Sequence, residues 1–219
     1  MNSFFNINLF IFLLLFFSDF NLNKYYFEKN IINIYKSIND TSIDFKCFEY
    51  AIIGYQYLYK KNLVKSNYIV IVDYTQPSFN ERLFLIDIKN KKLILKTKVA
   101  HGKNSGNIYP YSFSNIPNSN KSSIGFFITQ DEYIGKHGYS LRLKGIEEGI
   151  NDNAMDRGII IHGANYVSND YVKKYGRIGR SNGCLAVPVE INEKLIKIIK
   201  SGTCVFIYYP EKEYFNKSK

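Results

Sequence analysis

The sequence predicts a mainly β domain preceded by helices and carrying a few short flanking helices. The 219 residues are 46% hydrophobic, which is enough to bury the core of one domain. Residues 23–67 repeat their apolar side chains at helical spacing. From Tyr68 onward the chain breaks into short runs of β-branched and aromatic residues separated by turn residues, which is typical of strands.

The first twenty residues contain an apolar run, Leu9 to Phe17, that is too short to span a bilayer comfortably. Its length is typical of a signal-peptide core. No Lys or Arg precedes the run and no clean small-x-small cleavage site follows it, so a membrane anchor remains open beside a signal peptide for residues 1–20. The run is not closed by a Cys, which argues against a lipoprotein anchor. We expect a cell-envelope protein, periplasmic or secreted, with membrane attachment as an option.

Residues 21–66 are predicted to form a helical extension. Within it, residues 44–67 place five apolar side chains on one helical stripe: Phe48, Ala51, Ile52, Tyr55 and Leu58.

Residues 67–210 are predicted to form the β domain, followed by a polar tail over 211–219. Strands are expected within residues 68–74, 81–102, 122–133, 139–146, 157–163 and 203–210. The second of these ranges reads as two strands joined near Asn90. One short helix begins at Ser168, and another runs through residues 191–202 and ends at Gly202. Residues 101–123 are rich in Ser, Asn, Gly and Pro and form a long loop of a kind that often serves binding.

The net charge and the cysteines limit which partners and which kinds of site we expect. The net charge of +10 comes mainly from Lys, and no nucleic-acid-binding motif accompanies it, so we expect no nucleic-acid partner; an anionic envelope polymer suits the charge as well. The three cysteines, Cys47, Cys184 and Cys204, are an odd number with no close pair, so they form neither a disulfide framework nor a CxxC metal site. Cys47 and Cys204 lie in apolar elements and are expected to be inert.

The remaining cysteine shares a glycine-rich stretch with a histidine. A cysteine attacks as the thiolate, which is scarce near neutral pH unless a base or a positive charge lies beside it. His162 ends the apolar strand "GIIIH" and is the candidate base for Cys184. Gly183 lets a substrate approach backbone amides that could form an oxyanion hole. Arg177 and Arg180 could lower the pKa of the thiol or bind a substrate carboxylate. The spacing alone is equally consistent with a structural role, in which His162 is a core histidine and Cys184 is a buried thiol.

Two segments, "IHGANYVS" and "GRIGRSNGCLAVP", resemble the active-site signature of the L,D-transpeptidase catalytic domain, in its murein L,D-transpeptidase branch. Further similarity lies in "ERLFLIDIKNKKLILKTKVAHGKNSG" and "SGTCVFIYYP", and the resemblance covers most of residues 45–210. It implies a β-sandwich catalytic domain.

The resemblance places the nucleophile on Cys184 and the general base on His162. It places Gly183 and Ser181 in the turn before the thiol. Asn182 stands where most members have a second histidine, and Leu185 stands where many have Arg. These departures bear on substrate preference. The expected substrate-binding set is Arg180, Arg177, His101, His137 and Gly163, with a structural role open for both of its histidines.

The function implied is peptidoglycan cross-linking: the thiol attacks the amide after the third residue of a tetrapeptide stem, releases D-alanine and forms a thioester that another stem's amine resolves. Resolution by water would instead make an L,D-carboxypeptidase, and a non-catalytic peptidoglycan-binding module is the alternative of another class. No cofactor and no metal are expected, and the protein is expected to be a monomer. A zinc site of His101, His137, His162 and Cys184 is the remaining alternative, although it lacks the usual closely spaced ligand pair.

Overall fold

The computed structural model describes residues 28–211 and residue 214. The chain divides into two compact units, residues 1–39 and 40–219. In the first unit, residues 28–38 are helical. The apolar leader predicted for residues 1–20 lies outside the described residues. Within the described part of the chain, no helix is long and apolar enough to cross a membrane.

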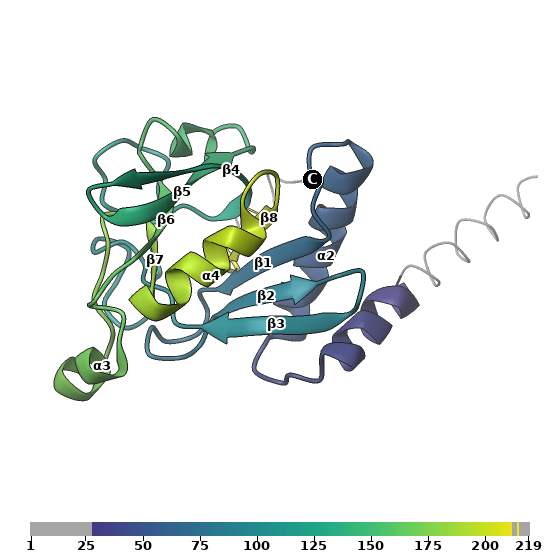
Figure 1. The fold of residues 1–219 in the computed structure, drawn as a ribbon, viewed down its shortest axis with the longest axis horizontal. Helices are drawn as coiled ribbons and strands as arrows, with labels where there is room; N and C mark the ends of the chain where they lie inside the picture. Colours follow the sequence, from purple (N-terminus) through teal and green to yellow (C-terminus); the bar gives the residue numbers. More distant parts are fainter. Residues whose placement is uncertain (1–27, 212–213, 215–219) are drawn as a thin grey trace, which may run out of the picture. The chain divides into compact units, whose positions relative to one another are not determined.

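The second unit begins with helix α2, Phe45–Lys60 (Figure 1). Asp44 caps its N-terminus, because the carboxylate accepts a hydrogen bond of 2.9 Å from the backbone N–H of Cys47. The predicted apolar stripe is buried, and α2 packs on strands β1 and β8. The boundary between units therefore lies at residue 39, not at residue 66 as the change from helical to strand pattern suggests, because α2 packs with the sheet.

A single hydrogen-bonded sheet of eight strands forms the centre of the second unit, in the order β3-β2-β1-β8-β4-β5-β6-β7. The strands are β1 Tyr68–Asp73, β2 Leu83–Asp87, β3 Lys92–Thr97, β4 Gly125–Gly135, β5 Gly138–Gly145, β6 Ile160–Gly163, β7 Leu185–Val187 and β8 Cys204–Tyr208. The predicted mainly β fold with few helices is confirmed. β7 has three residues, too few for a recognisable alternation, so the sequence does not predict it.

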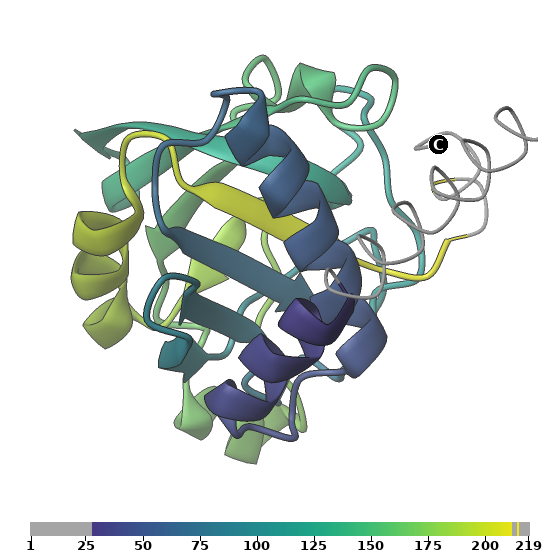
Figure 2. The ribbon, with the colours of Figure 1, turned by 90° about the vertical axis from the view of Figure 1, so that its right-hand side faces the viewer.

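The last strand, β8, lies in the middle of the sheet. It pairs in parallel with β1 and antiparallel with β4. Every residue of β8 and all but the first residue of β1 are buried, so both faces of this part of the sheet are covered. Figure 2 shows α2 running across these strands.

Within the described residues, the second unit also contains the 3₁₀ turn η1, Asp152–Ala154, and the helices α3, Asn169–Tyr175, and α4, Val189–Ile199. α3 begins after Ser168, as predicted, because the Ser168 hydroxyl accepts a hydrogen bond of 3.2 Å from the Tyr171 N–H. α4 follows β7 directly and packs on β5, β6 and β1. It leads from the sheet edge that carries β7 back to β8 in the centre.

Candidate active site

The edge pair β6–β7 carries both residues of the predicted catalytic pair. The two strands are parallel, with His162 opposite Ala186 and Ile161 opposite Leu185. Cys184 directly precedes β7 and so lies two positions before Ala186. The pairing of β6 with β7 brings the chain segments that carry His162 and Cys184 to neighbouring strands, because Cys184 immediately precedes the first paired residue of β7.

Cys184 is half-buried, whereas Cys47 and Cys204 are fully buried. Its Sγ donates a weak hydrogen bond of 3.6 Å to the Gly158 carbonyl. Burial raises the pKa of the Cys184 thiol, and the Ile160 backbone N–H and the charges of Lys136 and Arg157 oppose that rise. The resting group is therefore a neutral thiol that needs a base to become a nucleophile.

His162 is available as that base. Its Nδ1 lies 2.9 Å from the Gly163 carbonyl oxygen. A carbonyl only accepts hydrogen bonds, so Nδ1 carries the proton and Nε2 keeps its lone pair. Burial lowers the pKa of His162, the neighbouring His137 lowers it further, and the Gly163 carbonyl opposes both. The ring is therefore neutral near neutral pH, which is the form that can accept the thiol proton.

The turn before the thiol is held by a serine. The buried Ser181 hydroxyl donates a 2.7 Å hydrogen bond to the Cys184 carbonyl and accepts one of 3.0 Å from the Gly183 N–H. This corrects one expectation: the Gly183 amide is used inside the turn and is not free to bind an oxyanion. Asn182, at the tip of the turn, is exposed.

Gly183 is a glycine for a packing reason. Its φ is +126°, and a Cβ there would lie 2.8 Å from the Lys121 carbonyl oxygen and 3.0 Å from Ile159 Cδ1. A side chain would strain the backbone and push the turn away from the residue-121 loop.

The two arginines before the thiol brace loops. Arg177 Nη1 donates to the adjacent Ile178 carbonyl at 2.8 Å. Arg180 Nη1 donates to the carbonyls of Gly106 at 3.0 Å and Lys103 at 3.2 Å. Neither is among the charges that influence the Cys184 thiol. The expectation that these arginines lower the pKa of the thiol is therefore not met.

Arg157 and Lys136 are the cations that act on the thiol, and sequence reasoning missed both. Arg157 donates to the carbonyls of Ser114 at 2.5 Å and Lys121 at 2.6 Å, and also to the hydroxyls of Ser119 and Ser123. Its Nη2 lies 3.5 Å from the Cβ position of Gly183. The Arg157 guanidinium thus orders the loop of residues 114–123 directly beside residues 181–184, the nucleophile turn. No sequence motif marks Arg157.

His101 is a buried brace, which makes direct contact with a substrate untenable. Its Nδ1 accepts a 2.8 Å hydrogen bond from Arg82 Nη2, and its Nε2 faces the Gly106 carbonyl at 3.3 Å. Burial and the charge of Arg82 lower the pKa of His101 to about 3. Its backbone carbonyl accepts the Ser181 N–H at 2.9 Å. His101 thus supports the nucleophile turn from behind, which is the structural role left open for it above.

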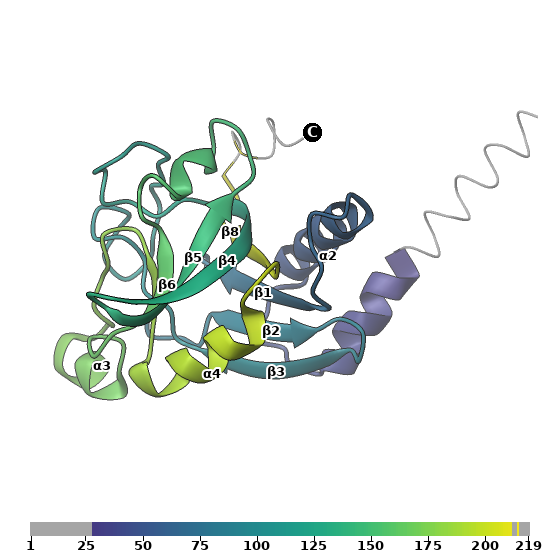
Figure 3. The same cartoon turned by 45° about the horizontal axis from the view of Figure 1, so that its top comes forward.

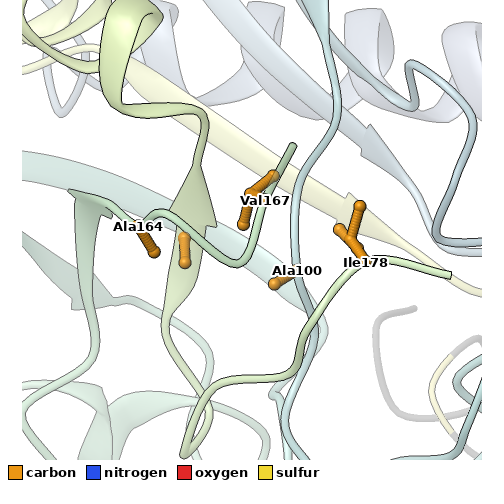
Figure 4. Packing of buried hydrophobic residues seen from close by; sticks show 5 residues of the cluster. Ala100, Ala164, Val167 and Ile178 are labelled. Carbon is orange, nitrogen blue, oxygen red and sulfur yellow. The ribbon is translucent and has the colours of Figure 1, made fainter. Parts of the chain in front are cut away.

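A small cluster of buried apolar residues includes part of β7 (Figure 4). It comprises Ala100, Ala164, Val167, Ile178 and Ala186. These residues come from the loop after β3, the loop after β6, the segment after α3, and β7. Their packing fixes β7, and with it the position of the thiol, against both flanking loops.

A pocket of about 580 Å³ opens beside the base. The tip of the β4–β5 hairpin, the end of β6, the 164–166 loop and the first turns of α4 surround it. His162, Gly163 and His137 line it, and Cys184 does not. Two members of the expected substrate-binding set, His137 and Gly163, therefore lie where a ligand of the base would bind.

The described residues contain no group of three or more His, Cys, Asp and Glu side chains arranged to hold a metal ion. His101 uses both ring nitrogens on Arg82 and Gly106 and contributes nothing to a shared site with His137 and His162.

A family model described as the L,D-transpeptidase catalytic domain matches residues 39–208. Similar solved structures include an L,D-transpeptidase from Mycobacterium smegmatis, with 10% identity, a TM-score of 0.42, and coverage of 66% of this chain and 59% of that one. The L,D-transpeptidase from Xylanimonas cellulosilytica has 16% identity and a TM-score of 0.37, and the match covers 66% of this chain and 61% of that one. The helical cell shape determining protein Pgp2 from Campylobacter jejuni has 15% identity and a TM-score of 0.45, and the match covers 69% of this chain and 54% of that one.

No curated protein matches the chain. The chain spans less than two thirds of the length of each of these three solved chains. The family model covers well over half of the 219 residues, including β6, the nucleophile turn and β7. The resemblance inferred from the sequence is thereby confirmed, and the chain belongs to the L,D-transpeptidase catalytic domain family.

Proposed function

We propose that the chain is a cysteine transpeptidase that cross-links or remodels peptidoglycan by acting on tetrapeptide stems. The observation that carries this proposal is the β6–β7 register. It supports the proposal because His162 and the half-buried Cys184 belong to neighbouring segments of the chain, and Nδ1 of the histidine is bound to Gly163, which leaves Nε2 as a base. Cys47 and Cys204 are buried and have no such partner in reach of a substrate.

The chemistry runs through a thioester. His162 Nε2 accepts the Cys184 proton as Sγ attacks the carbonyl carbon of the stem's third residue. The amide C–N bond then breaks, and the protonated His162 gives its proton to the leaving D-alanine amine. In the second half, an amine from another stem loses a proton to His162 and attacks the thioester. The C–S bond breaks, His162 returns its proton to the leaving Cys184 sulfur, and release of the new amide leaves the enzyme in its starting state.

Charge placement supports this sequence of steps. Lys136 and Arg157 oppose the effect of burial on the thiol, so they stabilise the thiolate when the proton moves to His162. The pocket beside His162 suits the second substrate, because an amine bound there meets the base before it reaches the acyl group on Cys184.

An L,D-carboxypeptidase would share the first half-reaction and differ only in resolving the thioester with water. A non-catalytic binding module is less well supported, because it needs neither the buried neutral base nor the half-exposed thiol. The apolar run Leu9 to Phe17 supports a place in the cell envelope, by export or anchoring. A mature N-terminus between about Ser18 and Lys24 is expected if the run is a cleaved signal.

The decisive experiment is covalent labelling by a carbapenem, the β-lactam class to which this family's cysteine is typically sensitive. Intact-protein mass spectrometry should detect one adduct, peptide mapping should place it on Cys184, and Cys184→Ala should abolish it while remaining folded. Incubation with a tetrapeptide and an amine acceptor then separates transpeptidation from hydrolysis by product mass. An adduct on Cys47 or Cys204, or chelator-sensitive activity in Cys184→Ala, would overturn the covalent mechanism.

A further inference from the structure

The β4–β5 hairpin ends in a tight turn that contains a histidine. Gly135 at the end of β4 pairs with Gly138 at the start of β5, so only Lys136 and His137 lie between the strands. Gly138 has a φ of +73°, which favours glycine and permits the chain to reverse at this point. Figure 3 shows this hairpin beside β6. So short a turn fixes the backbone position of His137 relative to β4 and β5.

The same hairpin places His137 on the candidate base. Ser140 of β5 pairs with His162 of β6, so the turn lies just beyond the base along the strand. The His137 and His162 rings stack with centroids 4.4 Å apart and an interplanar angle of 22°. Both side chains line the pocket. The His162 imidazole is thus held at Nδ1 by the Gly163 carbonyl and over one ring face by His137.

These two contacts do different things. The hydrogen bond to Gly163 selects which nitrogen carries the proton, and the stack restricts the plane in which Nε2 can lie. A positive charge on the His137 ring would also disfavour a second positive charge on His162, because like charges at this separation repel.

We propose that His137 is a positioning residue for His162, because its stacked ring fixes the plane in which the base lies. This inference rests on the proposed function. His137 is assigned no contact with the thiol or with the reacting atoms.

Other charged or titratable groups face the histidine pair from each neighbouring element. Lys136 and Tyr139 belong to the hairpin, Tyr166 to the loop after β6, and Glu193 to α4. Glu193 is engaged by Lys197 at 2.6 Å, which moderates its influence on the pocket. Cys184 precedes β7. Since these groups remain in place in every variant below, differences between variants report on residue 137 alone.

The test separates the ring from the charge. His137→Phe keeps an aromatic ring without the charge, and His137→Lys keeps a charge without the ring. Ile134→Ala, at an exposed position of the same hairpin, is the matched control. For each purified full-length protein, the rate of carbapenem adduct formation on Cys184 is measured by intact mass from pH 4.5 to 8.5, and folding is checked by thermal denaturation.

We expect His137→Phe to keep the maximal rate within about threefold and to move the acid limb of the profile to higher pH. His137→Lys should keep the acid limb near its original position and lose at least about tenfold in maximal rate, within the roughly 10²-fold cost of misplacing a catalytic group by 1 Å. Ile134→Ala should leave both unchanged.

Two results overturn the inference. If Phe and Lys both reach the original maximal rate, the ring does not orient the base. If His137→Phe loses as much maximal rate as His137→Lys, an aromatic ring at position 137 is not what orients the base. Either result would leave the proposed function intact as long as the unsubstituted protein is acylated on Cys184. Failure of that acylation would instead remove the function itself.

Discussion

Replacing Gly183 with alanine tests whether the nucleophile turn depends on its contact with the residue-121 loop. The new methyl group would sit 2.8 Å from the Lys121 carbonyl oxygen, which already accepts the Arg157 hydrogen bond at 2.6 Å. Neither group can yield without disturbing the other. The turn therefore has to move by a few tenths of an ångström or more, and Cys184 moves with it.

The substitution is expected to lower both the stability of the protein and the rate of acylation. A non-glycine residue at a φ of +126° costs about 1–3 kcal/mol, which for a chain of this length lowers Tm by roughly 2–12 °C. Displacement of the thiol lowers the acylation rate on top of that, by up to about 10²-fold for a shift approaching 1 Å. We expect both effects in Gly183→Ala, measured by calorimetry and by the rate of carbapenem adduct formation.

Gly176→Ala is the matched control. Gly176 has a φ of +68°, and nothing lies within 4 Å of its Cβ position. It caps α3, away from the thiol, so this variant should lose stability through backbone strain alone and acylate at the original rate. Should Gly183→Ala behave as the control does, with full acylation, the fit between the turn and the Lys121 carbonyl is not what positions the nucleophile.

Further outcomes are expected at four other positions. His162→Ala should lower turnover about 10²-fold or more, as measured by product formation from a tetrapeptide and an amine. His101→Ala should lower Tm, because it leaves a buried Arg82 donor unpaired at a cost of about 1–3 kcal/mol, and calorimetry with no change in Tm would contradict that role. Arg157→Met removes a charge that favours the thiolate, so the pKa of Cys184 should rise and the midpoint of iodoacetamide alkylation should move to higher pH. Asn182→His should retain acylation, because position 182 is exposed and His162 already supplies the base; a folded but inactive variant would show that the turn is built differently.

The sequence predicts most of the strands, because these depend on local patterns. Short continuous apolar runs mark β1 and β8, and the segment "SNGC" marks the turn before Cys184. The partners of the thiol follow no local pattern. Arg157 and Lys136 reach Cys184 only because β4, β5, β6 and β7 are neighbours in the sheet.

Burial explains the other differences between expectation and structure. His101 precedes a glycine, as His137 and His162 do, so nothing in the sequence distinguishes the three. The difference arises from Arg82, which is fully buried and donates a hydrogen bond to His101. Arg82 precedes β2 and His101 follows β3, so two strands separate them in the sequence. In the sequence, Gly183 suggests that a substrate can reach the backbone amides of the turn. In the structure, the Gly183 N–H donates to the Ser181 hydroxyl and is not free for a substrate.

The central place of β8 has a consequence for folding. β3, β2 and β1 lie on one side of β8, and β4, β5, β6 and β7 lie on the other. During synthesis, residues 204–208 emerge after every other strand of the sheet. Until then the two halves have no common strand to join them, and the long-range pairing of β1 with β8 cannot begin. The sheet is therefore joined into one only after residues 204–208 have become available for pairing.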